Sequence, residues 1–243
     1  MNPRPPFRYL GWMARDVAVR PGLACVVLAA LFTFLLSRLP PLSSPGLPSA
    51  PQEFLIRTVG QFDWLVVLIA TTGIVSWDRT SGYYRSLFSQ PVNPGLYYLQ
   101  RWLLAGVAVL SFVPLMGLGI LLVSGTFPYS GPLLEHLALK YLLLGGLTFA
   151  LSTVSRVDWL IAFLISILQG VLSGMTRAGV ELRGFTAVLR ELLPPFHLSE
   201  VGFGPLRYAT GSELAHTVLY GAGLLALALL ALNLRPLGSG GRA

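Results

Sequence analysis

Charged residues are scarce in this sequence, and lysine is almost missing. Asp, Glu, Lys and Arg make up 11% of the 243 residues, and hydrophobic residues make up 54%. Soluble domains carry roughly one quarter charged residues, so the composition predicts an integral membrane protein. Lys140 is the single lysine, and the formal net charge of +7 therefore comes from arginine. The arginines stand at the ends of apolar runs and no basic run alternates with aromatic residues, so we expect no nucleic-acid partner.

Motifs for catalysis and for cofactor binding are also missing. Cys25 is the only cysteine, which excludes an intrachain disulfide. There is no GxxxxGK(S/T) phosphate-binding loop, so we expect that this chain does not itself hydrolyse ATP. No HExxH motif, Cys cluster or spaced His set predicts a metal site. Ser173-Gly174 lacks the preceding Gly-x of an intramembrane serine protease. We therefore expect no enzyme, and no metal or cofactor within the chain.

Six long apolar runs predict six membrane-spanning helices. Their approximate ranges are 22–38, 62–77, 102–123, 133–154, 159–175 and 213–234. The expected fold class is an all-α polytopic membrane protein, with residues 1–243 forming one transmembrane domain. If the amino terminus lies inside, the short inner segments hold most of the arginines. Both termini are therefore predicted on the cytoplasmic side of an inner or plasma membrane.

Two further segments are predicted to lie on membrane surfaces. Residues 1–20 have an apolar side opposite an arginine side, which indicates an interfacial amphipathic helix; a merely basic leader is the alternative. The apolar side contains Leu10, Met13, Ala14 and Val17, and the basic side contains Arg8 and Arg15. Residues 176–212 would lie outside, where apolar residues at nearly helical spacing predict one or two amphipathic helices.

A polar stretch between the second and third apolar runs, from Trp77 to Arg101, breaks the pattern. Its first half can form a short helix with an apolar stripe. The stripe consists of Tyr83, Tyr84, Leu87 and Phe88. Pro91 ends this helix, and Asn93 and Pro94 suit the N-cap and the first position of the next one. Residues 78–95 are thus predicted to be a cytoplasmic loop with a helix lying along the membrane surface.

The order of residues in this loop resembles the first cytoplasmic loop of ABC-2 type permeases. In that pattern an acidic residue stands at the end of the span and is followed by a Gly, a Leu and a Pro-Val pair. The matching positions are Asp78, Gly82, Leu87, Pro91 and Val92. The later string Leu193 to Leu198, LPPFHL, is similar to the Pro-Phe-His-like sequence that follows the interfacial or re-entrant outer helices of that family.

The resemblance implies that the loop is a coupling helix, which docks on a separately encoded ATPase. The residues implied in this contact are Asp78, Arg79, Gly82, Tyr83, Tyr84, Arg85, Leu87, Phe88 and Pro91. ATP and Mg would be bound by the partner ATPase, and a second copy or a paralogue of the permease would complete the pathway. The implied function is ATP-driven export of an unidentified, hydrophobic or lipid-like substrate.

Four residues elsewhere are candidates for the pathway or an outer gate: Asp63, Gln169, Pro194 and His197. Asp63 is predicted at the outer end of the second span, where a solvated or helix-capping acid is the alternative. Gln169 equally suits a hydrogen bond between helices. His136 is predicted at the outer interface, where we interpret it as solvated rather than as a proton or ligand site.

A second function is compatible with the same sequence. Few carboxylates lie inside the predicted spans, which argues against a proton-coupled carrier. No polar substrate path is evident either. A non-transporting, ABC-2-like membrane anchor or regulatory subunit of a larger complex would have much the same sequence.

Overall fold

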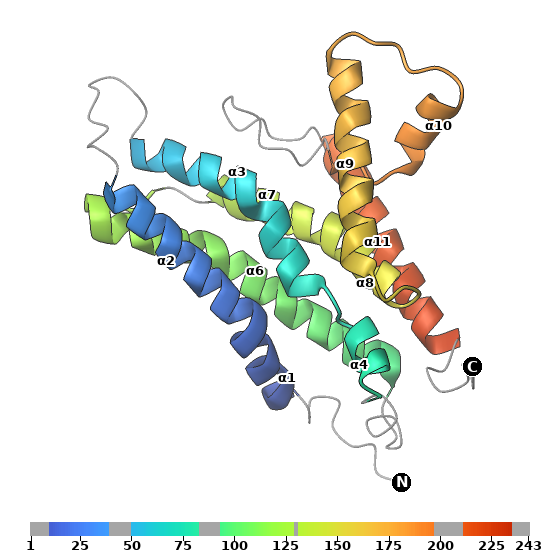
Figure 1. Ribbon diagram of the computed structural model, residues 1–243, viewed down its shortest axis with the longest axis horizontal. Coiled ribbons are helices and arrows are strands. Elements are labelled where there is room, and N and C mark those ends of the chain that lie inside the picture. The colour runs from blue at the N-terminus through green and yellow to red at the C-terminus, as the bar shows by residue number, and fades with distance from the viewer. Residues whose placement is uncertain (1–9, 39–49, 83–92, 129–130, 197–210, 235–243) are drawn as a thin grey trace. The chain divides into compact units, whose positions relative to one another are not determined.

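The computed structural model describes five stretches of the chain, residues 10–38, 50–82, 93–128, 131–196 and 211–234. Every regular element in these stretches is a helix, and they contain no strand (Figure 1). Six helical runs are long and apolar enough to cross a membrane. These are Met13–Leu35, Gln52–Thr80, Pro94–Ser124, Gly131–Ser152, Asp158–Arg177 and Leu214–Leu234. The described part of the chain therefore has the helical, multi-pass character that the composition predicted.

The first candidate span is joined directly to the helix before it. Helix α1 (Leu10–Val17) continues through a π-helical segment, η1 (Ala18–Gly22), into α2 (Leu23–Arg38). Pro21 lies inside η1, and the wider turn suits a residue that has no N–H to donate. The described part of the predicted surface helix 1–20 is thus continuous with the first span, and residues 1–9 lie outside the described residues.

The second candidate span begins earlier than predicted and is interrupted near its end. Helix α3 covers Ala50–Thr71, whereas the apolar run alone placed its start near residue 62. Its first turns are polar, and Glu53 and Arg57 form an exposed ion pair one helical turn apart. Gly73 then adopts a φ of 74°, a left-handed conformation that commonly ends helices. A short helix, α4 (Ser76–Thr80), follows this turn.

The third and fourth candidate spans are α6 and a three-part helical run. Helix α6 (Pro94–Ser124) starts where predicted, because the Asn93 side-chain oxygen accepts a hydrogen bond from the Leu96 N–H at 3.0 Å. The fourth run consists of α7 (Gly131–Lys140), the π-helical segment η2 (Tyr141–Gly145) and α8 (Gly146–Ser152). Residues 153–157 then connect α8 to the fifth span.

The last three helices are α9 (Asp158–Arg177), α10 (Phe185–Leu192) and α11 (Gly211–Leu234). Helix α10 lies in the segment 176–212 that was predicted to hold amphipathic helices. Three of its apolar side chains are exposed, those of Phe185, Val188 and Leu192. The boundaries of the fifth and sixth spans agree with the predicted ranges 159–175 and 213–234 to within a few residues.

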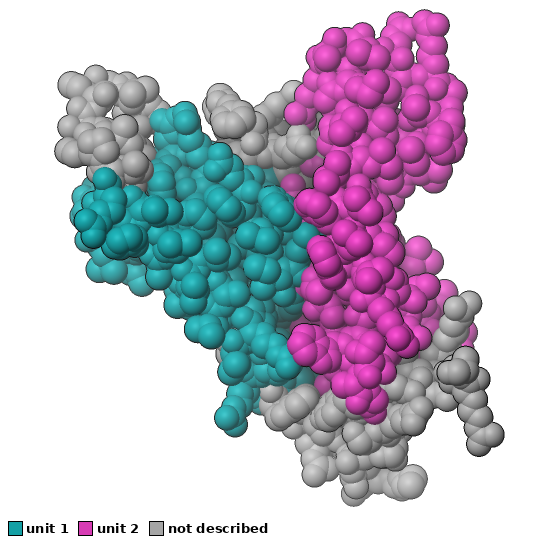
Figure 2. All heavy atoms as spheres, in the orientation of Figure 1, with its two compact units in different colours: residues 1–70, 103–138, 201–207 teal, residues 71–102, 139–200, 208–243 magenta. Residues whose placement is uncertain are grey.

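The chain divides into two compact units (Figure 2). The first contains Met1–Ala70, Leu103–Ala138 and Val201–Arg207. Its core is built from α2, α3, α6 and α7, whose fully buried side chains include Leu55, Phe112, Met116, Leu133 and Leu137. The ring centres of Phe32 on α2 and Phe62 on α3 lie 4.6 Å apart, so these two helices are in contact at this point.

The second unit contains Thr71–Trp102, Leu139–Glu200 and Tyr208–Ala243. Here α11 packs against η2 and α8 through small residues. A Cβ atom on Gly221 would lie 2.6 Å from Leu142 Cγ, and one on Gly146 would lie 3.3 Å from the Gly221 carbonyl oxygen. The glycines of α8 and α11 therefore permit a close helix contact within this unit.

Candidate functional site

A set of polar residues in the second unit joins the ends of four candidate spans. We call it the polar junction, and it consists of Gly73, Ser76, Asp78, Arg79, Arg101, Thr153 and Asp158. Gly73 to Arg79 belong to the end of the second span, and Arg101 belongs to the third. Thr153 follows the fourth span, and Asp158 is the first residue of the fifth. The loop of residues 78–95 leaves from this junction.

Asp158 fixes the turn between α3 and α4. Its carboxylate oxygen Oδ2 accepts a hydrogen bond from the Gly73 N–H at 3.0 Å and one from the Ser76 hydroxyl at 3.4 Å. The other oxygen accepts from the Trp159 N–H at 2.9 Å, as an acid at a helix start can do. Asp158 is 1% exposed, so these donors satisfy a carboxylate that the protein has removed from solvent. The first residue of α9 therefore holds the interrupted end of the second span.

Asp78 is buried and paired with Arg101. The Arg101 Nη1 atom lies 2.8 Å from Asp78 Oδ2, and the two side chains are 13% and 11% exposed. The same nitrogen donates to the Ile74 carbonyl oxygen at 3.1 Å. Tyr98, on the same helix as Arg101, is also fully buried in this region. Asp78 thus binds the second span to the third at the root of the loop.

Arg79 connects the same root to the fourth span. Its Nη1 atom donates to the Thr153 carbonyl oxygen at 2.6 Å. Thr153 follows the last residue of α8, where carbonyl groups have no partner within the helix. Arg79 is itself exposed, so it lies at the edge of the junction.

The rest of the predicted coupling contact is only partly described. Gly82 has a φ of 71°, so the chain turns there just after α4. Tyr83, Tyr84, Arg85, Leu87, Phe88 and Pro91 lie outside the described residues. The structure therefore fixes where the loop begins and leaves its predicted helix a prediction.

Asp63 occupies a different position from the predicted one. Because α3 begins at Ala50, Asp63 lies in the middle of the helix rather than at the outer end of a span. Its Oδ2 atom lies 2.7 Å from His136 Nε2, and the two residues are 2% and 9% exposed. The interpretation of His136 as a solvated interfacial residue was wrong. The scarcity of carboxylates inside the spans was used as an argument against a proton-coupled carrier. That argument is weakened, because Asp63 is buried within a candidate span.

The other pathway candidates are only partly described. Gln169 is fully buried on α9, and Pro194 is buried after the end of α10. His197 lies outside the described residues. Gln169 and Pro194 both belong to the second unit, whereas Asp63 belongs to the first.

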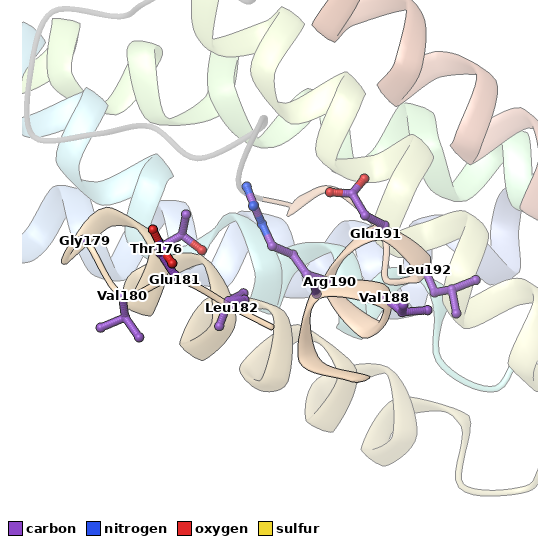
Figure 3. A pocket seen from close by; sticks show the side chains of 10 residues that line it. Thr176, Gly179, Val180, Glu181, Leu182, Val188, Arg190, Glu191 and Leu192 are labelled. Carbon is purple, nitrogen blue, oxygen red and sulfur yellow. The ribbon is translucent and has the colours of Figure 1, made fainter. Parts of the chain in front are cut away.

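A pocket of about 610 Å³ lies between the end of α9 and α10 (Figure 3). Its lining includes Thr176 from the end of α9, Val180 and Leu182 from the connection, and Val188, Arg190 and Leu192 from α10. Among the described residues, the Arg190 Nε atom is buried without a hydrogen-bond partner. The pocket combines an apolar wall with one cation, Arg190, and two acidic residues, Glu181 and Glu191. None of the pathway candidates that the structure describes lines it.

Comparison of the chain with protein-family models, with curated proteins and with solved structures finds no match in any of the three.

Sequence reasoning missed the partners that organise the junction. Arg101 was seen as an arginine at the end of an apolar run, and Asp158 as part of a short connection. An acid followed at once by a long apolar run is a helix-start signal, and it could have identified Asp158 as a capping residue. No local pattern reveals that the acid also binds Gly73, because that contact joins residues far apart in the chain.

Proposed function

We propose that this chain is the permease subunit of an ABC-2 type transporter. In this proposal it works with a second permease chain and with separate ATPase subunits to export an unidentified, hydrophobic or lipid-like substrate. Six candidate spans support a polytopic permease, and the residue order from Asp78 to Val92 supports a coupling loop between the second and third spans. Both termini and this loop would lie in the cytoplasm.

The polar junction is the observation that carries the proposal. A coupling loop must pass force from an ATPase to the spans, and a force needs a firm contact at the root of the loop. Asp78 and Arg79 provide such contacts to the third and fourth spans, and Asp158 provides one from the fifth. An ordinary solvated loop would not need ionic and hydrogen-bonded links to three neighbouring spans, of which those through Asp78 and Asp158 are buried.

The burial of Asp78 changes its role within the proposal. Its carboxylate is bound to Arg101 and is 11% exposed, so it is a positioning residue rather than a surface contact for the ATPase. Docking would then fall to Tyr83, Tyr84 and Phe88, with Arg85 as the nearby cation. Nucleotide-driven closure of the ATPases would push these residues, and the junction would pass the displacement on to the spans.

The first experiment is gentle purification of the full chain from its native membrane, followed by identification of the chains that co-elute. We expect an ABC ATPase in stoichiometric amounts. Co-elution of another assembly without an ATPase would instead support the anchor or regulatory subunit.

The second experiment tests the loop itself. Tyr84→Ala and Phe88→Asp should lower recovery of the ATPase and the stimulation of its hydrolysis by about tenfold or more, because each removes an apolar anchor from the interface. Phe185→Asp on α10 is a matched control, since it changes an exposed aromatic that lies outside the loop. Unchanged recovery and stimulation in both loop variants would contradict the coupling role.

A further inference from the structure

The buried pair of Asp63 and His136 is independent of the polar junction. It joins α3 to α7 within the first unit, with Oδ2 and Nε2 separated by 2.7 Å. Both residues lie inside candidate membrane spans, Gln52–Thr80 and Gly131–Ser152. Ionisable side chains inside a membrane are costly and are usually kept for a function.

Three of the positions one turn from the pair are apolar, and one turn after His136 on α7 is Lys140. One turn to either side of Asp63 on α3 are Val59 and Val67, and one turn before His136 on α7 is Leu133. All three are fully buried. Residues one turn apart share a helix face, so Asp63 lies in an apolar strip of α3 that favours the uncharged or paired state.

Other described charged groups on the packed helices are engaged elsewhere or exposed. The part of α6 that belongs to this unit, residues 103–124, has no ionisable residue. The charged groups on the remaining helices are Arg15, Asp16, Arg20, Arg38, Glu53, Arg57, Glu135 and Lys140. Arg20 pairs with Asp16, and Arg57 pairs with Glu53. Arg38 lies 5.0 Å from the centre of the Phe34 ring, and Lys140 lies 5.9 Å from the centre of the Phe196 ring. Arg15 and Glu135 are exposed.

We propose that Asp63 and His136 form a proton-binding site inside the membrane part of the protein. Binding of a proton to the His136 ring converts a hydrogen bond to a carboxylate into an ion pair. In surroundings of low dielectric constant this attraction is stronger than in water. The contact between α3 and α7 therefore tightens as the pH falls and the ring takes up its proton. This inference does not depend on the proposed transporter.

The test is nuclear magnetic resonance of the full chain in detergent, with the histidine rings labelled with ¹⁵N. The sequence has three histidines, so His197→Gln and His216→Gln identify the His136 signals without touching the pair. The titration runs from about pH 4.5 to 8.5, the interval that brackets ordinary histidine titration. We expect the His136 nitrogens to change from the neutral to the protonated pattern within it.

Two variants separate a proton site from a structural hydrogen bond. Asp63→Asn should lower the proton affinity of His136 by about tenfold or more, because the opposite charge beside the ring is lost. Glu135→Gln, which removes an exposed charge from the neighbouring residue, should leave the affinity within about threefold. The proposal is overturned if wild-type His136 keeps one protonation state throughout, a result that needs no variant to fold. It is also overturned if Asp63→Asn leaves the titration in place.

Discussion

Arg101 is the residue on which most of the polar junction depends. Its guanidinium binds both the Asp78 carboxylate and the Ile74 carbonyl oxygen, so one side chain of the third span holds two points at the end of the second. An arginine suits this work because its planar fork can reach several acceptors at once. Removal of one partner from such a pair leaves a charge that solvent reaches poorly.

Arg101→Met should therefore destabilise the protein strongly. We expect a loss of about 3–5 kcal/mol, because Asp78 would remain buried without its counter-charge. Arg57→Met is the matched control, since its pair with Glu53 is exposed and such pairs contribute about 1 kcal/mol or less. Thermal unfolding in one detergent would measure both. A double variant with Asp78→Asn should recover part of the loss, and equal effects of the two arginine variants would argue against a buried pair.

Individual side-chain environments were the part of the site that the sequence predicted least. The positions of Asp78 and Arg79 in a polar loop were evident, but the burial of Asp78 depends on Arg101, which comes from another helix. Similarly, His136 stands beside Glu135 and near Lys140, a neighbourhood typical of an interface. Which face of α7 packs against α3 decides that Glu135 is exposed while His136 contacts Asp63, and the local sequence does not reveal it.

At the scale of elements, small residues determine how closely the helices of the second unit approach. Gly221 on α11 faces Leu142 of η2, and the backbone of α8 lies against the same part of α11. Small residues in membrane helices let two backbones come together where larger ones would keep them apart. The alanine-rich and glycine-rich sequence of the sixth span predicted such packing, without identifying its partner.

Gly221→Ala should separate α11 from η2. The added Cβ would lie 2.6 Å from Leu142 Cγ and 3.0 Å from the Leu142 carbonyl oxygen, so the helices must shift. We expect a destabilisation of about 1–3 kcal/mol. Gly223→Ala is the control, because its Cβ meets nothing within 4 Å and alanine favours a helix. Both would be compared by thermal unfolding, and a stable Gly221→Ala protein would show that this contact is looser than described.

The sequence predicted the presence of the membrane-spanning helices better than the residues at which they begin and end. The six apolar runs correspond to the six candidate spans, because hydrophobic length is a property of the local sequence. The start of α3 at Ala50 was missed because Glu53 to Arg57 suggested only a short surface helix in an outside loop, separate from the span. A helix can accept these side chains when they are exposed or paired, and periodicity of apolar residues does not detect that.

For the whole molecule, the arrangement across the membrane is the property on which the proposed function depends. The count of arginines predicts that both termini and the loop 78–95 lie on the cytoplasmic side. Residues 124–132, between the third and fourth spans, would then lie outside. Ser81 and Thr126 are exposed positions in these two regions.

Single cysteines at these positions can test the arrangement in intact cells. In a Cys25→Ser background, which removes the only native thiol, Thr126→Cys should react with a membrane-impermeant maleimide. Ser81→Cys should react only after the membrane is opened. The reverse result would place the loop outside and would remove the basis for an ATPase contact.

The turn at Gly73 has a consequence for the order in which the parts of the protein respond. An uninterrupted helix would transmit a displacement of its end along its whole length. Here the α-helical hydrogen-bond pattern is broken between α3 and α4. In contrast, the Gly73 amide and the Ser76 hydroxyl are hydrogen-bonded to Asp158, the first residue of the neighbouring helix α9. A displacement that starts at α4 would therefore reach the fifth span at its first residue, before it travels up the second.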